Sequence, residues 1–476
     1  MSKAVFLLIF VLLLSGCTQG NTGAVKSGDV QSPETFKSQL SDSCRGCNVL
    51  IIGIDTLRPD HSSAFGYSKD TTPNLAEFAD ESYVFSNAIS AAPWTVPSFM
   101  TMFTGAYPSD HKVVNKYEIF DETRQVISNL KKLSPEAVTL TEMLKSYNYS
   151  TAGFTGDAGV SAQFGYGSGF DYYLDDKAFA GLDHSANPAL EWLKANKTGP
   201  FYMFLHGYDL HGQYDITGSF SGRFLDFDYN GSFTGSKKEE AVLREKVVAN
   251  EPLNLTGDDA RFWLAVYDEK VYNADQRFGQ FWREFKEMGL DRNTIVIIVS
   301  DHGEEFYEHQ MFDHGHSLYD ELIHTALIMH LPSGERRVVT DQVRTIDILP
   351  TIFDILGKPV PANAIKQVRG ESLVPVMSGG HWQRDAFSET DYRLYTHKRS
   401  IRTYDGWKFI KTFEDGRTEL YNLNTDPGEQ ANLNETQRQK AYELEQKLYV
   451  FMRMTNQDEN KLKILGCLPV YPEECK

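Results

Sequence analysis

Short apolar runs alternate with predicted helices along much of this chain. Three runs, residues 48–54, 201–205 and 294–299, are almost wholly apolar, which is typical of strands buried on both faces of a parallel sheet. The predicted helices between them are residues 135–146, 187–194 and 267–288. Alternation of strand and helix predicts an α/β fold with a doubly wound, mostly parallel sheet and helices on both faces.

Two segments depart from this alternation. Residues 215–259 contain many Gly, Ser and Asn residues and a Lys-Lys-Glu-Glu run, which indicates a surface insertion. From residue 386 the pattern changes to short alternating runs, followed by a charged helix from about residue 435 to 454. We therefore expect a main domain over residues 44–385 and a smaller α+β domain over residues 386–476, and 476 residues suffice for both.

The N-terminus has the features of an export signal. Lys3 precedes an apolar stretch, residues 4–14, that is too short for an ordinary membrane-spanning helix. The sequence Leu-Ser-Gly-Cys ending at Cys17 resembles a bacterial-type lipobox, so we expect residues 1–17 to direct export and Cys17 to carry a lipid. An uncleaved anchor or plain secretion is the alternative. Polar residues 18–43 resemble a flexible tether, and the protein is expected outside the cytoplasm, lipid-anchored to the cell membrane.

The charge of the chain limits its partners. A formal net charge of -18 and a pI near 5.2 argue against nucleic acid or an anionic membrane surface as a partner, since the summed field repels polyanions. Contact with the membrane is expected through the N-terminal lipid only. An anionic substrate must be attracted by local charge, which a metal ion can supply.

Four further cysteines lie at the two ends of the mature chain. They are Cys44, Cys47, Cys467 and Cys475. In an oxidising compartment disulfides are the expected outcome, and any of the three connectivities is open. A redox pair or half of a zinc site is the alternative, but no thioredoxin-like context and no neighbouring His supports it.

Metal-competent side chains follow each of the three apolar runs. Asp55 follows the first, His206 the second, and Asp301 with His302 the third. Because ligand sites of open α/β sheets lie at the carboxyl ends of strands, these side chains are expected to share one crevice. Two carboxylates and an imidazole suit a divalent cation. An Asp in such a place can also simply cap the next helix.

A hydroxyl residue, Thr95, stands at the start of a predicted helix within residues 92–108. Backbone N–H groups at a helix start favour anions. Coordination to a cation would lower the pKa of the hydroxyl and make Thr95 a nucleophile. Ser98, three residues further on, is the alternative.

Taken together, these motifs resemble the sulfatase family within the alkaline phosphatase superfamily. The resemblance extends over nearly the whole chain after the tether, with order and spacing both preserved. Its motifs are Ile-Asp-Thr-Leu-Arg-Pro-Asp-His at 54–61, Thr-Pro-Asn-Leu at 72–75, Thr-Gly-Ala-Tyr-Pro at 104–108 with His111, Ser-Asp-His-Gly-Glu at 300–304, His-Gly-His-Ser-Leu-Tyr-Asp-Glu at 314–321, and Leu-Tyr-Asn-Leu-Asn-Thr-Asp-Pro-Gly-Glu at 420–429.

The resemblance implies an alkaline-phosphatase-like fold in which Asp55, Thr95, Asp301 and His302 bind the metal and Thr95 is the nucleophile. Sulfatases carry there a Cys or Ser in Cys/Ser-x-Pro-x-Arg, which is oxidised to formylglycine. This chain has Thr-Val-Pro-Ser-Phe, so the modifiable residue is missing and Phe99 replaces the Arg. Superfamily members with a metal-bound Thr are typically phosphodiesterases or phosphoryl-type transferases. The departure therefore favours phosphate esters, diesters above all, over sulfate esters.

Further site residues follow from the same resemblance. His211 and His316 are expected to be catalytic, and Asn115 and His314 to bind substrate. His206 and Asp209, together with His314, could hold a second cation. A satisfied core position for a His and a turn role for Asn115 are the structural alternatives. The cation is Mn, Ca, Mg or Zn, and one is expected rather than two.

The sequence thus predicts a metal-dependent hydrolase of small-molecule, glycan or lipid esters. One alternative is a transferase that moves a phosphoryl-linked group to a cell-surface glycan or lipid. Another is a noncatalytic surface binding protein, which would require a broken metal site, whereas Asp55, Thr95, Asp301 and His302 are all present.

Overall fold

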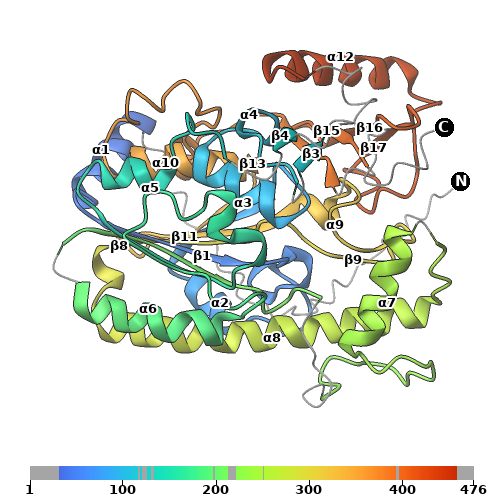
Figure 1. The fold of residues 1–476 in the computed structure, drawn as a ribbon, viewed down its shortest axis with the longest axis horizontal. Coiled ribbons are helices and arrows are strands. Elements are labelled where there is room, and N and C mark those ends of the chain that lie inside the picture. Colours follow the sequence, from blue (N-terminus) through green and yellow to red (C-terminus); the bar gives the residue numbers. More distant parts are fainter. Residues whose placement is uncertain are drawn as a thin grey trace, which may run out of the picture.

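The structure is a computed structural model and describes residues 32–115, 118–120, 126–129, 133–196, 199–212, 221–249, 251–392 and 396–457. Its centre is a sheet of nine described strands (Figure 1). Strand β1 (Asn48–Ile54) runs parallel to β7 (Phe201–Gly207) on one side and to β8 (Thr294–Val299) on the other, and every residue of these three strands is buried. The three apolar runs are therefore the buried parallel strands that the sequence predicts.

The remaining strands extend this centre on both sides, in the order β12-β2-β11-β8-β1-β7-β5-β6, with β13 paired to β2. Only β11 pairs in the antiparallel sense among the described strands of this sheet, with β8 and β2, so the sheet is mostly parallel as predicted. The bounds are β2 Ser82–Ile89, β5 Ser150–Phe154, β6 Tyr172–Leu174, β11 His324–His330, β12 Arg337–Val339 and β13 Val343–Arg344.

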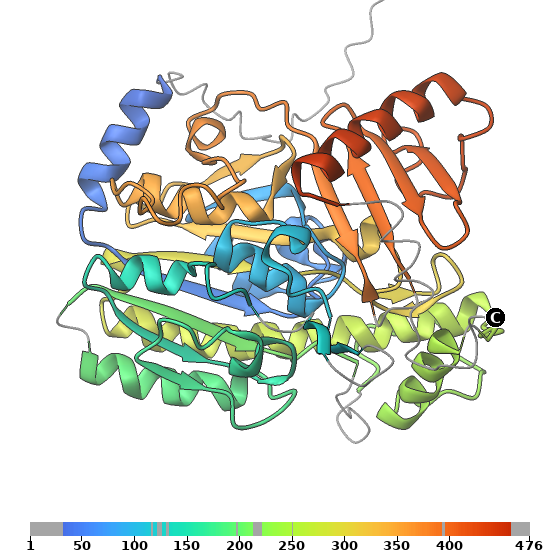
Figure 2. The same cartoon turned by 45° about the horizontal axis from the view of Figure 1, so that its top comes forward.

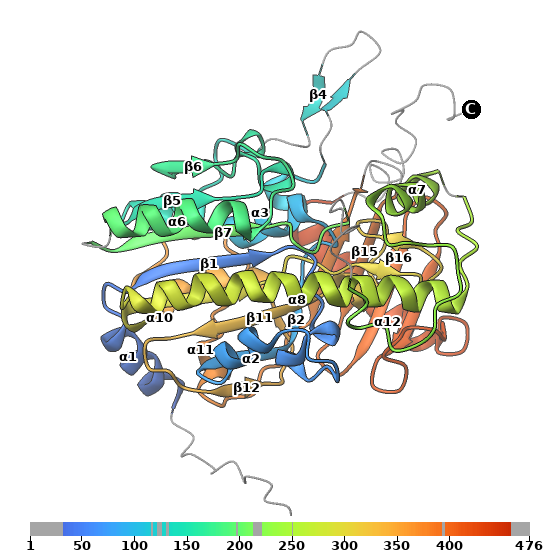
Figure 3. The same cartoon turned by 90° about the horizontal axis from the view of Figure 1, so that it is seen from below.

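Helices cover both faces of the sheet. Alternate side chains of β1 point to opposite faces and so pack against different helices. Val49 and Ile51 belong to the core shared with the helices of one face, whereas Leu50 and Ile52 face the other. The first face carries α3 (Thr95–Thr104), α5 (Leu140–Lys145) and α10 (Ile348–Ile355), and the second carries α2 (Pro73–Ala79), α6 (Leu182–Asn196) and α8 (Gly257–Glu287). Figure 3 shows α8 crossing beneath the sheet.

Helix α8 begins well before the predicted start at residue 267. Thr256 and Asp259 form a capping box, in which the Thr256 hydroxyl accepts from the Asp259 amide and the Asp259 carboxylate accepts from the Thr256 amide. Helix α7 (Lys237–Val248) precedes it within the predicted insertion. This helix packs on the main domain. It buries Leu243 and Val247, and it contacts the second strand of the hairpin formed by β9 (Glu305–Phe306) and β10 (Phe312–Asp313).

Part of the predicted tether is helical. Helix α1 (Pro33–Ser43) packs Phe36 and Leu40 into the core beside α10 and α11 (Val374–Met377). Cys17 and the export signal lie outside the described residues. Within the described part of the chain, no helix is both long and apolar enough to cross a membrane.

The expected disulfides are not found at the described cysteines. Cys44 and Cys47 are both buried free thiols at the end of α1. Cys467 and Cys475 lie outside the described residues.

The smaller C-terminal domain has the predicted α+β content. An antiparallel sheet of β14 (Ala386–Thr390), β15 (Lys398–Arg402), β16 (Trp407–Thr412) and β17 (Thr418–Asn422) packs against α12 (Arg438–Met454), as Figure 2 shows. Their shared core is distinct from those of the main sheet. The remaining short elements are α4 (Pro108–His111), α9 (Asp320–Ile323), β3 (Glu118–Phe120) and β4 (Val126–Asn129).

A partly buried histidine, His309, joins the two domains. Nδ1 of His309 lies 2.6 Å from Oε1 of Glu321, its Nε2 lies 3.2 Å from the carbonyl oxygen of Glu429, and its ring stacks on Tyr319 with centroids 3.6 Å apart. Burial lowers the pKa of His309, but the Glu321 carboxylate outweighs it and raises this pKa to about 9. His309 is therefore charged at neutral pH and donates from both ring nitrogens.

Gly53 of β1 is a position where the sheet packs closely against its neighbours. A Cβ added there would lie 2.6 Å from Cζ of Phe99 and 2.9 Å from Cδ2 of His206. Gly53→Ala should therefore lower the free energy of unfolding by about 1–3 kcal/mol in urea titrations, the usual cost of overpacking. Gly199→Ala is the matched control, since a Cβ there meets nothing within 4 Å. Equal stabilities of the two variants would contradict this packing.

Candidate active site

The carboxyl ends of three adjacent strands meet at one edge of the sheet. Asp55 follows β1, Asp301 and His302 follow β8, and His206 lies near the end of β7. Ligand atoms of Asp55, Asp301 and His302 lie within 4.8 Å of one another, and all three residues are buried. The polar side chains that follow the three apolar runs therefore lie together at this edge of the sheet.

Helix α3 brings Thr95 to this cluster at its first residue. The Thr95 hydroxyl donates to Oδ2 of Asp55 at 3.0 Å and lies 3.4 Å from Nε2 of His302. The hydroxyl of Ser98 instead donates to the backbone carbonyl of Asp301 at 2.7 Å. Ser98 thus ties α3 to the loop after β8, while the Thr95 hydroxyl faces the carboxylates.

The charges in the cluster would be offset by a cation. Burial raises the pKa of the Asp301 carboxyl well above its usual range, and the negative charge of Asp55 raises it further. Among the described residues, neither carboxylate oxygen of Asp301 accepts a hydrogen bond. Two buried carboxylates in such an arrangement are costly unless a positive charge lies between them.

The tautomer of His302 fits the same conclusion. Its Nδ1 lies 2.8 Å from the carbonyl oxygen of Gly303, so the proton is assigned to Nδ1 and the lone pair of Nε2 points toward Asp301 and Thr95. Burial lowers the pKa of His302 well below its usual range, which keeps the ring neutral. A neutral imidazole, two carboxylates and a hydroxyl are a donor set that fits a divalent cation.

His206 and Asp209, predicted as second-metal ligands, have different surroundings. His206 is buried, its Nε2 lies 4.0 Å from Oδ2 of Asp55, and neither ring nitrogen has a hydrogen-bond partner among the described residues. Burial lowers the pKa of His206 to about 3. Asp209 accepts from the Leu182 amide at 2.8 Å and pairs with Arg277, so its carboxylate is bound to α6 and α8 instead.

Two further histidine rings, those of His314 and His211, form a row with the ring of His302. The ring centroid of His314 lies 4.4 Å from that of His302 and 4.9 Å from that of His211. Burial and the charge of His314 both lower the pKa of His211, whereas the Asp313 and Glu304 carboxylates raise the pKa of His314 against the effect of burial. A neutral and a cationic imidazole therefore lie side by side, next to the acidic cluster.

The structure directs the other two predicted residues toward structural contacts. Nε2 of His316 lies 2.8 Å from Oε2 of Glu305, and Lys398 donates to the His316 carbonyl. The amide of Asn115 donates to the carbonyl of Asp391 at 2.8 Å. These contacts are with Glu305, Lys398 and Asp391 rather than with His302.

Three residues of the site escape sequence reasoning. Nδ1 of His314 lies 3.0 Å from Oε1 of Glu304 and 2.9 Å from Oδ1 of Asp313, and Arg244 pairs with the other oxygen of Asp313. Glu304 is the last residue of the motif at 300–304, and Asp313 directly precedes the motif at 314–321. Arg244 belongs to the insertion, where the only signal is the helical spacing of buried residues around it.

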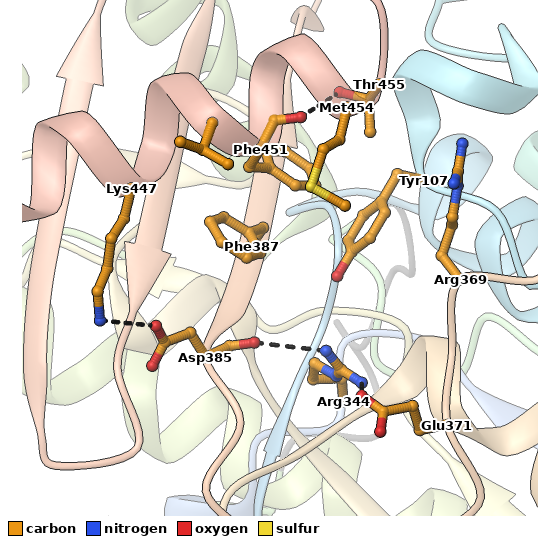
Figure 4. A pocket seen from close by; sticks show the side chains of 11 residues that line it. Tyr107, Arg344, Arg369, Glu371, Asp385, Phe387, Lys447, Phe451, Met454 and Thr455 are labelled. Atoms are coloured by element: carbon orange, nitrogen blue, oxygen red, sulfur yellow. Dashed lines mark hydrogen bonds and ion pairs between the residues drawn. The ribbon is translucent and has the colours of Figure 1, made fainter.

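A pocket of about 450 Å³ lies elsewhere, between α12 and the segment after α3 (Figure 4). Charged groups at its edge pair with one another, Lys447 with Asp385 at 3.1 Å and Arg344 with Glu371 at 3.5 Å. None of the predicted site residues lines it. Its lining is Tyr107, Arg344, Arg369, Glu371, Asp385, Phe387, Lys447, Val450, Phe451, Met454 and Thr455.

Comparison with known proteins identifies the family. A family model described as Sulfatase matches residues 47–358, and a second, described as N-sulphoglucosamine sulphohydrolase, C-terminal, matches residues 307–457. The first match covers more than half of the chain.

Individual relatives agree with these matches. Arylsulfatase K of Canis lupus familiaris is 25% identical over 426 residues, covering 76% of this chain and 74% of that protein. Delta 4,5-hexuronate-2-O-sulfatase of Bacteroides thetaiotaomicron is 23% identical over 418 residues, covering 81% and 84%. Phosphonate monoester hydrolase of Agrobacterium radiobacter has a similar fold, with a TM-score of 0.66, 19% identity and coverage of 86% and 96%. This protein is therefore an ester hydrolase that belongs to the sulfatase family.

Proposed function

We propose that the protein is a metal-dependent hydrolase of phosphate diesters, or of sulfate esters, with unmodified Thr95 as its nucleophile. One observation carries this proposal. The Thr95 hydroxyl, at the first residue of α3, lies 3.0 Å from Oδ2 of Asp55 and 3.4 Å from Nε2 of His302. The hydroxyl of Ser98, the alternative nucleophile, instead donates a hydrogen bond to a backbone carbonyl.

Asp55, Thr95, Asp301 and His302 would hold the divalent cation, and His206 is close enough to Asp55 to support it. A bound cation would offset the two carboxylates, lower the pKa of the Thr95 hydroxyl and polarise the ester. Mn, Ca, Mg and Zn all remain candidates. A noncatalytic role would require a broken donor set, and this donor set is complete.

The residues of the chain supply the other requirements of a two-step displacement. Oδ2 of Asp55 accepts the hydrogen bond of the Thr95 hydroxyl and so orients its lone pairs for attack on phosphorus or sulfur. The cationic ring of His314 offsets negative charge on the non-bridging oxygens. As the Thr95 oxygen bonds to phosphorus or sulfur and the bond to the leaving oxygen breaks, the neutral ring of His211 would accept the proton lost by the hydroxyl and pass it to the leaving alkoxide; in the second step the proton lost by water would return to the Thr95 oxygen. Water then releases the bound group from Thr95.

The choice of phosphate over sulfate rests on the side chain of Thr95. Oxidation of Thr gives a ketone rather than the aldehyde of formylglycine, so elimination from a hydrated aldehyde is unavailable and water must attack the adduct. That route suits phosphate esters better. The fold similarity to a phosphonate monoester hydrolase supports this choice, while the named sulfatase relatives support a glycan sulfate ester as the second candidate.

We also propose that the protein acts outside the cytoplasm, anchored by a lipid on Cys17, which would favour glycan or lipid esters of the cell surface. The support is the apolar stretch followed by Leu-Ser-Gly-Cys. Cys17→Ala should leave the N-terminus unprocessed or release the protein from membranes, as fractionation and intact mass would report. Ser15→Ala is the control and should be processed normally. Unchanged membrane association of a Cys17→Ala protein would contradict the anchor.

Asp301→Asn should abolish metal binding and turnover together, because it removes a ligand and half of the negative charge in the cluster. Without metal the variant should melt above the metal-free wild type, since a buried uncompensated charge is gone, and added metal should no longer raise its Tm. Metal analysis and thermal melts with Mn, Zn, Ca and Mg measure this. Asp228→Asn, on an exposed residue, is the control. Full metal content in Asp301→Asn would refute the site.

Thr95→Ala should lower the rate of phosphodiester hydrolysis at least about a thousandfold while metal content and fold persist, as is usual for an activated nucleophile. Thr95→Ser should keep measurable activity, because the hydroxyl remains. Intact mass of the peptide carrying Thr95 should show no modification. Rates near wild type for Thr95→Ala, combined with inactive Ser98→Ala, would move the nucleophile to Ser98.

A further inference from the structure

We propose that Arg244, on helix α7 of the insertion, is a positioning residue for His314, so that the insertion completes the anion-binding side of the active site. This inference rests on the proposed function, because His314 is taken to face the ester oxygens. The inference is based on two ion pairs of Asp313: one carboxylate oxygen pairs with Arg244, and the other pairs with His314.

The contacts form a continuous path into the site. Nε of Arg244 donates to Oδ2 of Asp313, and Oδ1 of Asp313 lies 2.9 Å from Nδ1 of His314. The ring of His314 then contacts those of His302 and His211. Arg244 thus holds one oxygen of Asp313 by a hydrogen bond, and the other oxygen forms an ion pair with His314, so rotation of Asp313 would change the distance to His314.

The backbone of Asp313 needs such support. Its φ is +80°, in the left-handed region that residues with a side chain rarely adopt. A conformation of this kind persists only where its surroundings hold it, and it is typical of functional sites. Among the described residues, Arg244 is the one from outside the loop that forms an ion pair with the Asp313 side chain.

The pair is also well shielded from water. The side chains of Arg244, Asp313 and His314 are 14%, 7% and 5% exposed. Charge-assisted hydrogen bonds are strong where solvent screens them little. Glu304 also reaches Nδ1 of His314, at 3.0 Å, so loss of Arg244 should loosen His314 rather than release it.

Helix α7 is fixed against both histidine loops. Leu243 and Val247 are buried in the core around α8, and Glu240 lies 3.5 Å from Lys270 of α8. A Cβ on Gly212 would lie 2.2 Å from Oε1 of Glu240, so the Glu240 side chain of α7 packs directly against the turn that carries His211. The same helix therefore touches the turn that carries His211 and, through Arg244, the loop that carries His314.

The test uses the full-length metal-loaded enzyme and an ester that the wild type turns over. Arg244→Ala should lower kcat/KM about ten- to a hundredfold, mainly through kcat, with metal content unchanged. Guanidinium ion, added far below unfolding concentrations, should restore part of the loss, and Arg244→Lys should retain an intermediate rate. Lys238→Ala removes one charge from the exposed face of α7 and should have no effect.

A double-mutant cycle separates positioning from general stability. In a His314→Ala background, Arg244→Ala should cost little more, because the two residues act through one path. Additive losses, wild-type kinetics of Arg244→Ala, or a loss that neither guanidinium nor Arg244→Lys reduces would each overturn the inference. If Arg244→Ala does not fold, Arg244→Lys and its cycle with His314→Ala decide.

A wild-type enzyme that cleaves no ester would contradict the proposed function instead. The inference is then decided by the side-chain ¹⁵N shifts of His314 in labelled protein, assigned with His314→Ala. These shifts should change in Arg244→Ala and stay the same in Lys238→Ala. Unchanged shifts in Arg244→Ala would overturn it.

Discussion

The buried carboxylates of Asp55 and Asp301 are the constraint on which the rest of the site depends. They follow neighbouring parallel strands, so the register of β1 and β8 brings their like charges together away from water. Burying two such charges without compensation costs several kcal/mol, and a divalent cation is the compensation that their geometry fits. Folding of the sheet thus brings together the carboxylates of the candidate metal site.

The surroundings of the carboxylates are arranged by the backbone as much as by side chains. His302 is oriented by the carbonyl of Gly303, and α3 is tied to the β8 loop by Ser98 on the carbonyl of Asp301. Thr56, directly after Asp55, has a φ of +58°. The hydrogen bond of Ser98 holds the first turn of α3 beside the β8 loop, and this places the Thr95 hydroxyl against Asp55.

The loop after β8 is where the parts of the molecule meet. Its hairpin contacts α7 of the insertion through Arg244, and its outer turn contacts the C-terminal domain through His309. Between these contacts it carries Glu304 and His314. Elements far apart in sequence, the insertion and the C-terminal domain, thus contact one loop of the main domain.

The sequence alone determined the buried strands, the doubly wound sheet and the gathering of Asp55, Asp301 and His302, because continuous apolar runs that end in polar residues leave few other arrangements. It could not decide which polar residues face the site. Asp209 pairs with Arg277, and His316 contacts Glu305. Arg244 pairs with Asp313, although it lies in a segment predicted to be a surface insertion. Such choices depend on long-range partners, which periodicity does not encode, and only the tertiary structure decides them.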